Sequence, residues 1–226
     1  MKGIAYGVGV GPGDPELITY KAIRLIRENN VIAVPGPDPK KAAAYKIAAV
    51  IVPEIAEKEV VSVSIPMSKE YDVIREAHKK STGRIEAYLE QGKNVVYLTL
   101  GDPTIYSSFS YLQKILEEDG YQTETVSGVP SFCAAAARLK LSLAEWNEPL
   151  HILPAAYHTK DLLSGEGKYI LMKSGSHMKE IKKLLQEKGM HACAVANCGM
   201  ETEKVYDCLD EFPEDTGYFM LVIAGR

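Results

Sequence analysis

The sequence has little cysteine, no strong excess of charge and no long apolar run, and each shortage excludes a class of protein. Only 4 of the 226 residues are Cys and none forms a CxxC pair, so we expect reduced thiols in the cytoplasm rather than a disulfide scaffold. No stretch approaches the roughly 20 continuous apolar residues of a membrane span. The amino-terminal residues also lack the apolar centre of a secretory signal. We therefore expect no membrane partner.

The charge balance argues against nucleic acid as the main partner. The chain has 26 Lys and Arg against 30 Asp and Glu, a formal net charge of -4. A nucleic-acid-binding domain usually shows a basic stripe or run, and none is present here.

A metal site is not expected either. His191, Cys193 and Cys198 are close in sequence, but their spacing matches no closed zinc site. Small apolar positions on strands are the simpler interpretation of these cysteines.

The composition is that of a folded globular protein. Apolar residues make up 46% and charged residues 25% of the chain, close to the average of soluble domains. A length of 226 residues suits one large domain or two small ones.

The first half of the chain alternates buried strands with amphipathic helices. This rhythm predicts an α/β fold with a parallel or mixed sheet and helices on both faces. The strands are expected at Ile4–Val10, Val31–Val34, Val60–Ile65 and Asn94–Leu100, and the helices at Glu16–Glu28, Lys40–Val50, Glu70–Gln91 and Tyr106–Asp119.

The pattern changes near Gly120, and we predict two α/β lobes, residues 1–119 and 120–226. The last strands follow one another without helices between them, which favours antiparallel pairing at one edge. Helices are expected at Phe132–Leu139 and Met178–Lys188, and strands at Tyr121–Val126, Leu150–Leu153, Tyr169–Lys173, Ala192–Ala196, Lys204–Cys208 and Tyr218–Ile223.

A glycine-rich segment, Gly7–Leu17, follows the first predicted strand. Glycines at the carboxyl end of a strand allow close approach of the backbone to a ligand. The spacing is G-x-G-x-G-P-G rather than the G-x-G-x-x-G of dinucleotide folds, and Pro12 and Pro15 remove backbone donors. No acidic residue follows the second strand to bind a ribose, which argues against a nicotinamide-dependent oxidoreductase. A tight turn without a ligand remains an alternative.

A second loop, Thr99–Ser107, follows the most apolar predicted strand. Its sequence is T-L-G-D-P-T-I-Y-S. Ligands of open α/β sheets bind outside the carboxyl ends of strands, so two such loops favour a nucleotide-like ligand. Asp102 either bonds a ligand hydroxyl or caps the following helix.

Two later segments complete the pattern. Val126–Phe132 leads into the alanine-rich run Cys133–Ala137, whose small side chains allow close packing, and Ile170–Gly175 is a strand that ends in a turn.

In this order, the four segments resemble the tetrapyrrole methyltransferase superfamily, which uses S-adenosylmethionine. Its hallmark V-G-x-G-P-G-D-P-E-L-x-T-x-K-A runs here from Val8 to Ala22. The stretch Ile65–Lys69 (I-P-M-S-K) resembles the precorrin-2 or cobalt-factor II C(20)-methyltransferase branch in particular. Ser127–Pro130 and Asn197–Met200 depart from the usual loops of that branch.

The resemblance implies two α/β lobes with a ligand cleft between them, a homodimer, and methyl transfer from S-adenosylmethionine to a meso carbon of a tetrapyrrole in cobalamin biosynthesis. Asp102 and Tyr106 are the positional candidates for a catalytic base. The residues implied in binding S-adenosylmethionine are Pro12, Gly101, Asp102, Ile105, Ser131, Phe132, Met172 and Gly199.

The tetrapyrrole substrate carries many carboxylates, so an acidic protein must gather cations locally. Lys21, Arg138, Lys140 and Lys173 lie in or near the motifs. Related alternatives are methylation at another corrin position and a diphthine-synthase-like activity on a protein. A nucleotide-sensing module without catalysis is a further class.

Overall fold

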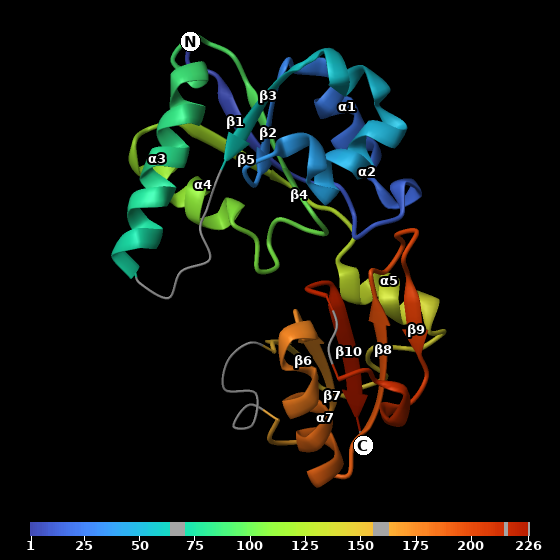
Figure 1. The fold of residues 1–226 in the computed structure, drawn as a ribbon. Helices are drawn as coiled ribbons and strands as arrows, with labels where there is room; N and C mark the ends of the chain where they lie inside the picture. Colours follow the sequence, from blue (N-terminus) through green and yellow to red (C-terminus); the bar gives the residue numbers. More distant parts are fainter. Residues whose placement is uncertain (64–70, 156–162, 215–216, 226) are drawn as a thin grey trace. The chain divides into compact units, whose positions relative to one another are not determined.

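The computed structural model describes residues 1–63, 71–155, 163–214 and 217–225. The chain forms two compact units, Met1–Pro130 and Ser131–Arg226 (Figure 1). The motif Ile65–Lys69 and the end of the predicted third strand lie outside the described residues.

The first unit is a parallel sheet of five strands in the order β3-β2-β4-β1-β5. The most apolar strands, β2 and β4, are interior and consist largely of buried residues, as expected where helices cover both faces. The strands are β1 (Ile4–Gly9), β2 (Val31–Pro35), β3 (Glu59–Val63), β4 (Val95–Thr99) and β5 (Gln122–Val126).

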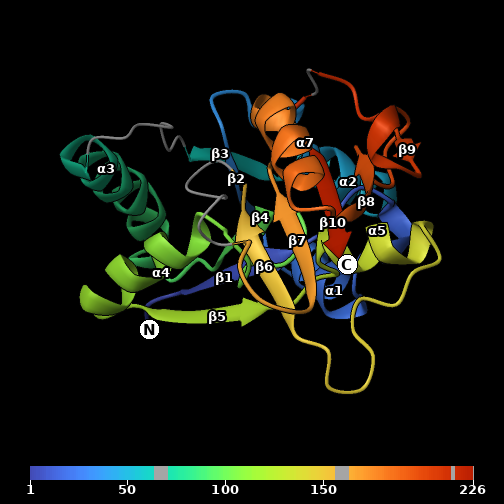
Figure 2. The ribbon, with the colours of Figure 1, turned by 90° about the horizontal axis from the view of Figure 1, so that it is seen from below.

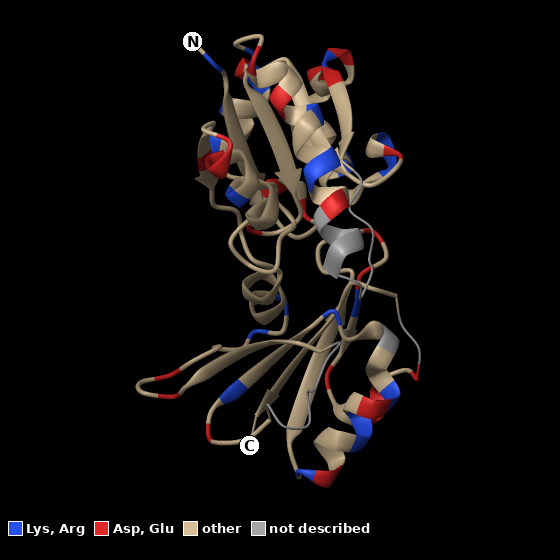
Figure 3. Ribbon diagram, turned by 90° about the vertical axis from the view of Figure 1, so that its left-hand side faces the viewer, with Lys and Arg blue, Asp and Glu red and all other residues tan. Residues whose placement is uncertain are grey.

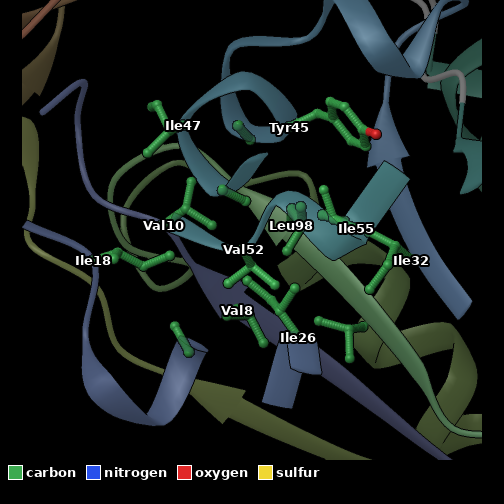
Figure 4. Close-up of a cluster of buried hydrophobic side chains, with 14 of the residues drawn as sticks. Val8, Val10, Ile18, Ile26, Ile32, Tyr45, Ile47, Val52, Ile55 and Leu98 are labelled. Atoms are coloured by element: carbon green, nitrogen blue, oxygen red, sulfur yellow. The ribbon is translucent and has the colours of Figure 1, made fainter. Parts of the chain in front are cut away.

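Two pairs of helices cover opposite faces of this sheet. In Figure 1, α1 and α2 lie on one side of the strands and α3 and α4 on the other. Val8, Ile26 and Leu98 belong to the core under α1 and α2, where Figure 4 shows their side chains together. Tyr97 and Phe109 belong to the core under α3 and α4. The helices are α1 (Tyr20–Glu28), α2 (Ala43–Ile51), α3 (Tyr71–Leu89) and α4 (Phe109–Glu118).

The strand order creates a switch point between β1 and β4. The chain leaves β1 for α1 and leaves the adjacent β4 for α4, and these helices cover opposite faces. The chain therefore turns to opposite faces of the sheet after β1 and β4, and the carboxyl edge at such a point is where open α/β sheets bind ligands.

The second unit is a mixed sheet in the order β6-β7-β10-β8-β9. The strands β6 and β7 are parallel, while β10 pairs antiparallel with both β7 and β8. Helix α7 packs on one face of this sheet (Figure 2), and α5 contacts β10. The elements are α5 (Ser131–Arg138), β6 (Leu150–Pro154), β7 (Lys168–Met172), α7 (Met178–Glu187), β8 (His191–Ala196), β9 (Lys204–Tyr206) and β10 (Met220–Gly225).

The fold confirms the α/β class and the antiparallel pairing of the last strands. The division falls later than the predicted boundary after residue 119, because β5 pairs in parallel with β1 and so completes the first sheet. The predicted helix Glu16–Glu28 is two elements: a short 3-10 turn, Pro15–Leu17, and then α1, which the Thr19 side chain caps by accepting from Ala22 N–H at 3.3 Å.

The predicted helix Tyr106–Asp119 starts only at Phe109. Tyr106 has a φ of 48° and cannot continue a helix, and Ser107 Oγ accepts a hydrogen bond from the Phe109 N–H at 3.1 Å.

Charged residues of both signs lie on the helices and loops, while most of the strand ribbon is uncharged (Figure 3). Among the described helices, none is both long and apolar enough to cross a membrane.

Candidate functional site

The loops after β1 and β4 are joined by backbone hydrogen bonds. Val10 N–H donates to the Thr99 carbonyl at 3.0 Å. One step further, Gly101 N–H donates to the Gly11 carbonyl at 2.8 Å, and Gly11 N–H donates back at 3.3 Å. Gly11 and Gly101 have φ values of 79° and 72°, which glycine adopts without a steric penalty. The two glycine-bearing loops therefore form one structure at the switch point.

The loop after β5 packs against the same structure through Gly128. A Cβ atom on Gly128 would lie 2.2 Å from the Gly101 carbonyl oxygen, and one on Gly9 would lie 2.5 Å from that same oxygen. Real Cβ atoms do not approach an oxygen so closely, so both positions require glycine. Three loops thus meet backbone to backbone around Gly101.

Asp102 is buried, with 7% of its surface exposed, and its carboxylate bonds within these loops. Oδ1 accepts from the Thr104 N–H at 2.7 Å and the Thr104 hydroxyl at 2.5 Å. Oδ2 accepts from the Gly128 N–H at 2.9 Å. The side chain does not cap α4, which was one of the two predicted roles; it joins the loop after β4 to the loop after β5.

The other first-unit candidates lie in the same loops. Pro12 is buried and follows Gly11 directly. Ile105 is half-buried, and its N–H donates to the Asp102 carbonyl at 3.3 Å. Tyr106 is 46% exposed and has a left-handed backbone, which is strained for a tyrosine. Burial raises the pKa of the Tyr106 phenol, and a tyrosine is protonated near neutral pH even at its ordinary pKa near 10. A protonated phenol can donate a hydrogen bond but cannot accept a proton as a base.

The remaining candidates lie in the second unit: Met172 and Gly199 at the carboxyl ends of β7 and β8, and Ser131 and Phe132 in α5. Met172 ends β7, and its carbonyl accepts from the Ala155 N–H at 2.8 Å. Lys173 follows with a φ of 60°, and its ammonium lies 5.6 Å from the centre of the Tyr218 ring.

Gly199 lies in the turn between β8 and β9, which Glu203 organises. Glu203 Oε2 accepts from the Gly199 N–H at 2.8 Å, and Oε1 accepts from Arg138 Nε at 2.5 Å. Burial opposes ionisation of Glu203, but these two bonds outweigh it and lower the pKa of the carboxyl group. The salt bridge fixes the end of α5 to the turn that bears Gly199.

Ser131 and Phe132 open α5, and Phe132 is buried. In the second unit the structure therefore places Met172 at the end of β7 and Gly199 in the turn after β8, at one edge of the sheet. Ser131 and Phe132 lie at the start of a helix that contacts β10.

Two of the four predicted cations are engaged by carboxylates. Lys21 Nζ lies 2.5 Å from Glu124 Oε1, and Arg138 pairs with Glu203. Each pair lowers the local positive charge that the sequence suggested for binding an acidic substrate.

Within the described parts of the chain, no group of three or more His, Cys, Asp and Glu side chains could hold a metal ion. All four cysteines are free thiols.

Sequence reasoning missed Gly9, Gly128, Thr104 and Glu203 as individual residues. Gly9 and Gly128 lie inside segments that were recognised. Gly9 ends β1 and Gly128 lies two residues after β5, and this position near strand ends was the available signal. Glu203 carried no such signal, because Arg138 is 65 residues away in sequence.

The fold is that of a two-unit α/β protein. Its first sheet carries glycine-bearing loops at the switch point between β1 and β4, on the carboxyl edge of the sheet. The comparisons with known proteins identify the class. Residues 5–211 match the family described as Tetrapyrrole (Corrin/Porphyrin) Methylases. The chain belongs to this family.

Two curated relatives are similar over nearly their whole length. The chain is 33% identical to a probable cobalt-precorrin-2 C(20)-methyltransferase of Methanocaldococcus jannaschii, covering 98% of this chain and 95% of the relative. It is 25% identical to a precorrin-2 C(20)-methyltransferase of a Sinorhizobium species, covering 96% and 93%.

Among solved structures, a uroporphyrin-III C-methyl transferase from Thermus thermophilus complexed with S-adenyl homocysteine has the same fold. Its TM-score is 0.75 at 24% identity, with 99% of this chain and 98% of that chain covered.

Proposed function

We propose that the protein transfers a methyl group from S-adenosylmethionine to the C(20) meso carbon of precorrin-2 or cobalt-precorrin-2, a step of cobalamin biosynthesis. The observation that carries the proposal is the pair of loops joined through Gly11 and Gly101 at the switch point. It stands together with 33% identity over nearly the whole chain to a relative named for this reaction.

The first-unit loops suit a nucleoside-like ligand. A Cβ atom on Gly9 or on Gly128 would clash with the Gly101 carbonyl oxygen, so the loop backbone is free of side-chain bulk there, at the edge where α/β sheets bind ligands. When bound, S-adenosylmethionine supplies an electrophilic methyl group on a sulfonium centre.

We assign the binding of this methyl donor to two sets of residues. Pro12, Gly101, Asp102 and Ile105 form the set in the first unit. The set in the second unit rests on family resemblance and consists of Ser131, Phe132, Met172 and Gly199.

The reaction makes modest demands on side-chain chemistry. The attacking meso carbon of a reduced tetrapyrrole is itself electron-rich, so alignment of the reacting atoms supplies much of the rate. The Tyr106 phenol is protonated near neutral pH and can donate a hydrogen bond. Rigid loops, rather than a strong base, are what this chain contributes.

A ligand-binding test separates this proposal from an oxidoreductase. S-Adenosylhomocysteine at about 100 times its Kd should raise the free energy of unfolding by about 2.7 kcal/mol, since it binds the folded state. NAD should leave the thermal midpoint unchanged. A shift with NAD and none with S-adenosylhomocysteine would reject the methyltransferase assignment.

Activity assays with different substrates then determine which corrin intermediate the protein methylates. Precorrin-2 and cobalt-precorrin-2 are each supplied with labelled S-adenosylmethionine, alongside precorrin-4 as a corrin intermediate methylated elsewhere. Turnover of precorrin-4 alone would replace the C(20) assignment by another corrin position.

We also propose that the protein is a cytoplasmic homodimer, on family resemblance and on its four free thiols. Light scattering of the purified protein should give twice the chain mass of 24.8 kDa. A monomer mass at micromolar concentration would reject the dimer.

A further inference from the structure

We propose that Asp102 is a positioning residue, which sets the spacing of the three ligand-binding loops, rather than the base of the reaction. The proposal rests on the proposed function, since it concerns how the loops are held for the methyl donor. It assigns a role to Asp102 from the bonds that its carboxylate makes.

The carboxylate is already occupied by the protein. A carboxylate offers about four acceptor positions. Three of them are taken in the described structure, two by Thr104 and one by the Gly128 N–H. All three donors come from the loops themselves, and Asp102 is only 7% exposed. A side chain held on both oxygens in this way is poorly placed to swing toward a substrate proton.

The loop after β5 needs such a bond. The ladder between β1 and β5 ends at the pair Val8 and Val126. Beyond it, Gly128 packs against Gly9 and the Gly101 carbonyl. A contact of this kind fixes how close the loops can come, but it does not prevent them from separating.

Asp102 supplies the attraction that the glycine contacts lack. Its Oδ2 holds Gly128 from one side, while its own backbone follows Gly101, which is bonded to Gly11. The hydroxyl of Thr19 adds a longer bond to the Ser127 carbonyl at 3.5 Å. One buried carboxylate thus connects the loops after β1, β4 and β5.

The substitution Asp102→Asn tests this directly. Asparagine keeps an acceptor for Thr104 but turns an NH₂ group toward the Gly128 N–H, so two donors face each other. The matched control is Asp38→Asn in the loop after β2, outside the three loops. Asp38 is exposed, and its carboxylate pairs with Lys41 Nζ at 3.0 Å.

Binding of S-adenosylhomocysteine is measured by calorimetry, and steady-state rates are measured over a range of pH. Asp102→Asn should weaken the Kd about tenfold, as expected for the loss of one hydrogen bond to a charged group. KM for S-adenosylmethionine should rise by a similar factor. The kcat at saturation should stay within about threefold of the parent and the pH profile should keep its shape. Asp38→Asn should match the parent.

Two results would overturn the proposal. A fall in kcat of more than about a hundredfold with unchanged Kd would make Asp102 the base. Unchanged Kd and KM with only a lower thermal midpoint would make the bond structural and unrelated to the ligand.

Should Asp102→Asn fail to fold, the pair Thr104→Val and Thr104→Ser replaces it. Valine removes one donor from Asp102 and serine keeps it, so the Kd should weaken a few-fold with valine and recover with serine. Equal affinities for valine and parent would count against the proposal. Failure of the parent itself to bind S-adenosylhomocysteine would instead reject the proposed function, whatever the variants do.

Discussion

Gly11 and Gly101 donate backbone hydrogen bonds to one another, at 3.3 and 2.8 Å, across loops that follow neighbouring parallel strands. Both have a positive φ, and the carbonyl oxygen of Gly101 packs against Gly9 and Gly128. The junction has no room for a side chain at Gly9 or Gly128, so we expect a substitution there to shift the loops of the proposed ligand site.

We therefore expect Gly101→Val to abolish measurable binding of S-adenosylhomocysteine while the protein remains folded. The substitution places a branched side chain at a φ of 72° and costs about 1–2 kcal/mol of backbone strain. The measurement is calorimetry together with circular dichroism.

Gly120→Val is the matched control for this variant. Gly120 has a similar φ of 79° in the same unit, but nothing lies within 4 Å of a Cβ built there. It should lose similar stability and keep its affinity. Equal affinities of Gly101→Val and the parent would make the loop purely structural.

Tyr106 should act without changing its ionisation. Because burial raises the pKa of its phenol, the parent should show no limb in its pH–rate profile from this group below about pH 9, given the reference tyrosine value near 10. Tyr106→Phe should keep the shape of the profile. Tyr20→Phe, at a tyrosine that is 80% exposed on α1, is the control. Loss of a limb near neutral pH in Tyr106→Phe alone would restore Tyr106 as a base.

The second unit should lose stability in acid through Glu203. The folded-state pKa of Glu203 lies below the reference 4.5, so its stabilising effect is present above that value. It is lost as pH falls through the lower folded pKa. Glu203→Gln should cost about 1 kcal/mol near neutral pH, on the scale of a net hydrogen bond, and flatten the acid limb of stability.

Denaturant titration between pH 3 and 7 measures this effect. Glu201→Gln, in the same turn, is the control. A parallel acid limb in Glu203→Gln and the parent would show that the Glu203 bonds add nothing.

His78 should make the first unit less stable as pH falls below neutrality. Its ring is buried between α3 and α4, stacked on Tyr111 with centroids 5.0 Å apart, and burial lowers its pKa below 6.5. The charged form is favoured in the unfolded chain, so stability is lost as pH falls from 6.5 through the folded value. Replacement by Gln should reduce this loss. An unchanged slope of thermal midpoint against pH in His78→Gln would contradict the assignment.

The sequence predicted the layers better than the boundaries. Continuous apolar runs located β2 and β4, because a strand that is buried on both faces must be apolar at nearly every position. The start of α4 was wrong because the positive φ of Tyr106 is imposed by the loop and has no local signature for a non-glycine residue. The end of the first unit could not be predicted from local pattern, because it is set by the long-range pairing of β5 with β1.

In the candidate site, too, features with a local sequence signal could be predicted, and features that depend on long-range contacts could not. Glycines after strands could be recognised from position alone, and both glycine loops were found. The bond from Asp102 to Gly128 joins residues 26 apart, and the pairing of Lys21 with Glu124 spans 103 residues. Such partners depend on the folded arrangement of the loops, so residue type could not reveal that these charges were already satisfied.

The most direct test of the proposed reaction is the position of the transferred methyl group. The purified protein is incubated with precorrin-2 or cobalt-precorrin-2 and S-adenosylmethionine carrying a ¹³C-labelled methyl group, and the product is examined by carbon NMR. The account predicts a single enriched methyl bonded to the C(20) meso carbon, with one S-adenosylhomocysteine released per product. Enrichment at any other ring position, or no transfer to either substrate by a protein that binds S-adenosylhomocysteine, would contradict it.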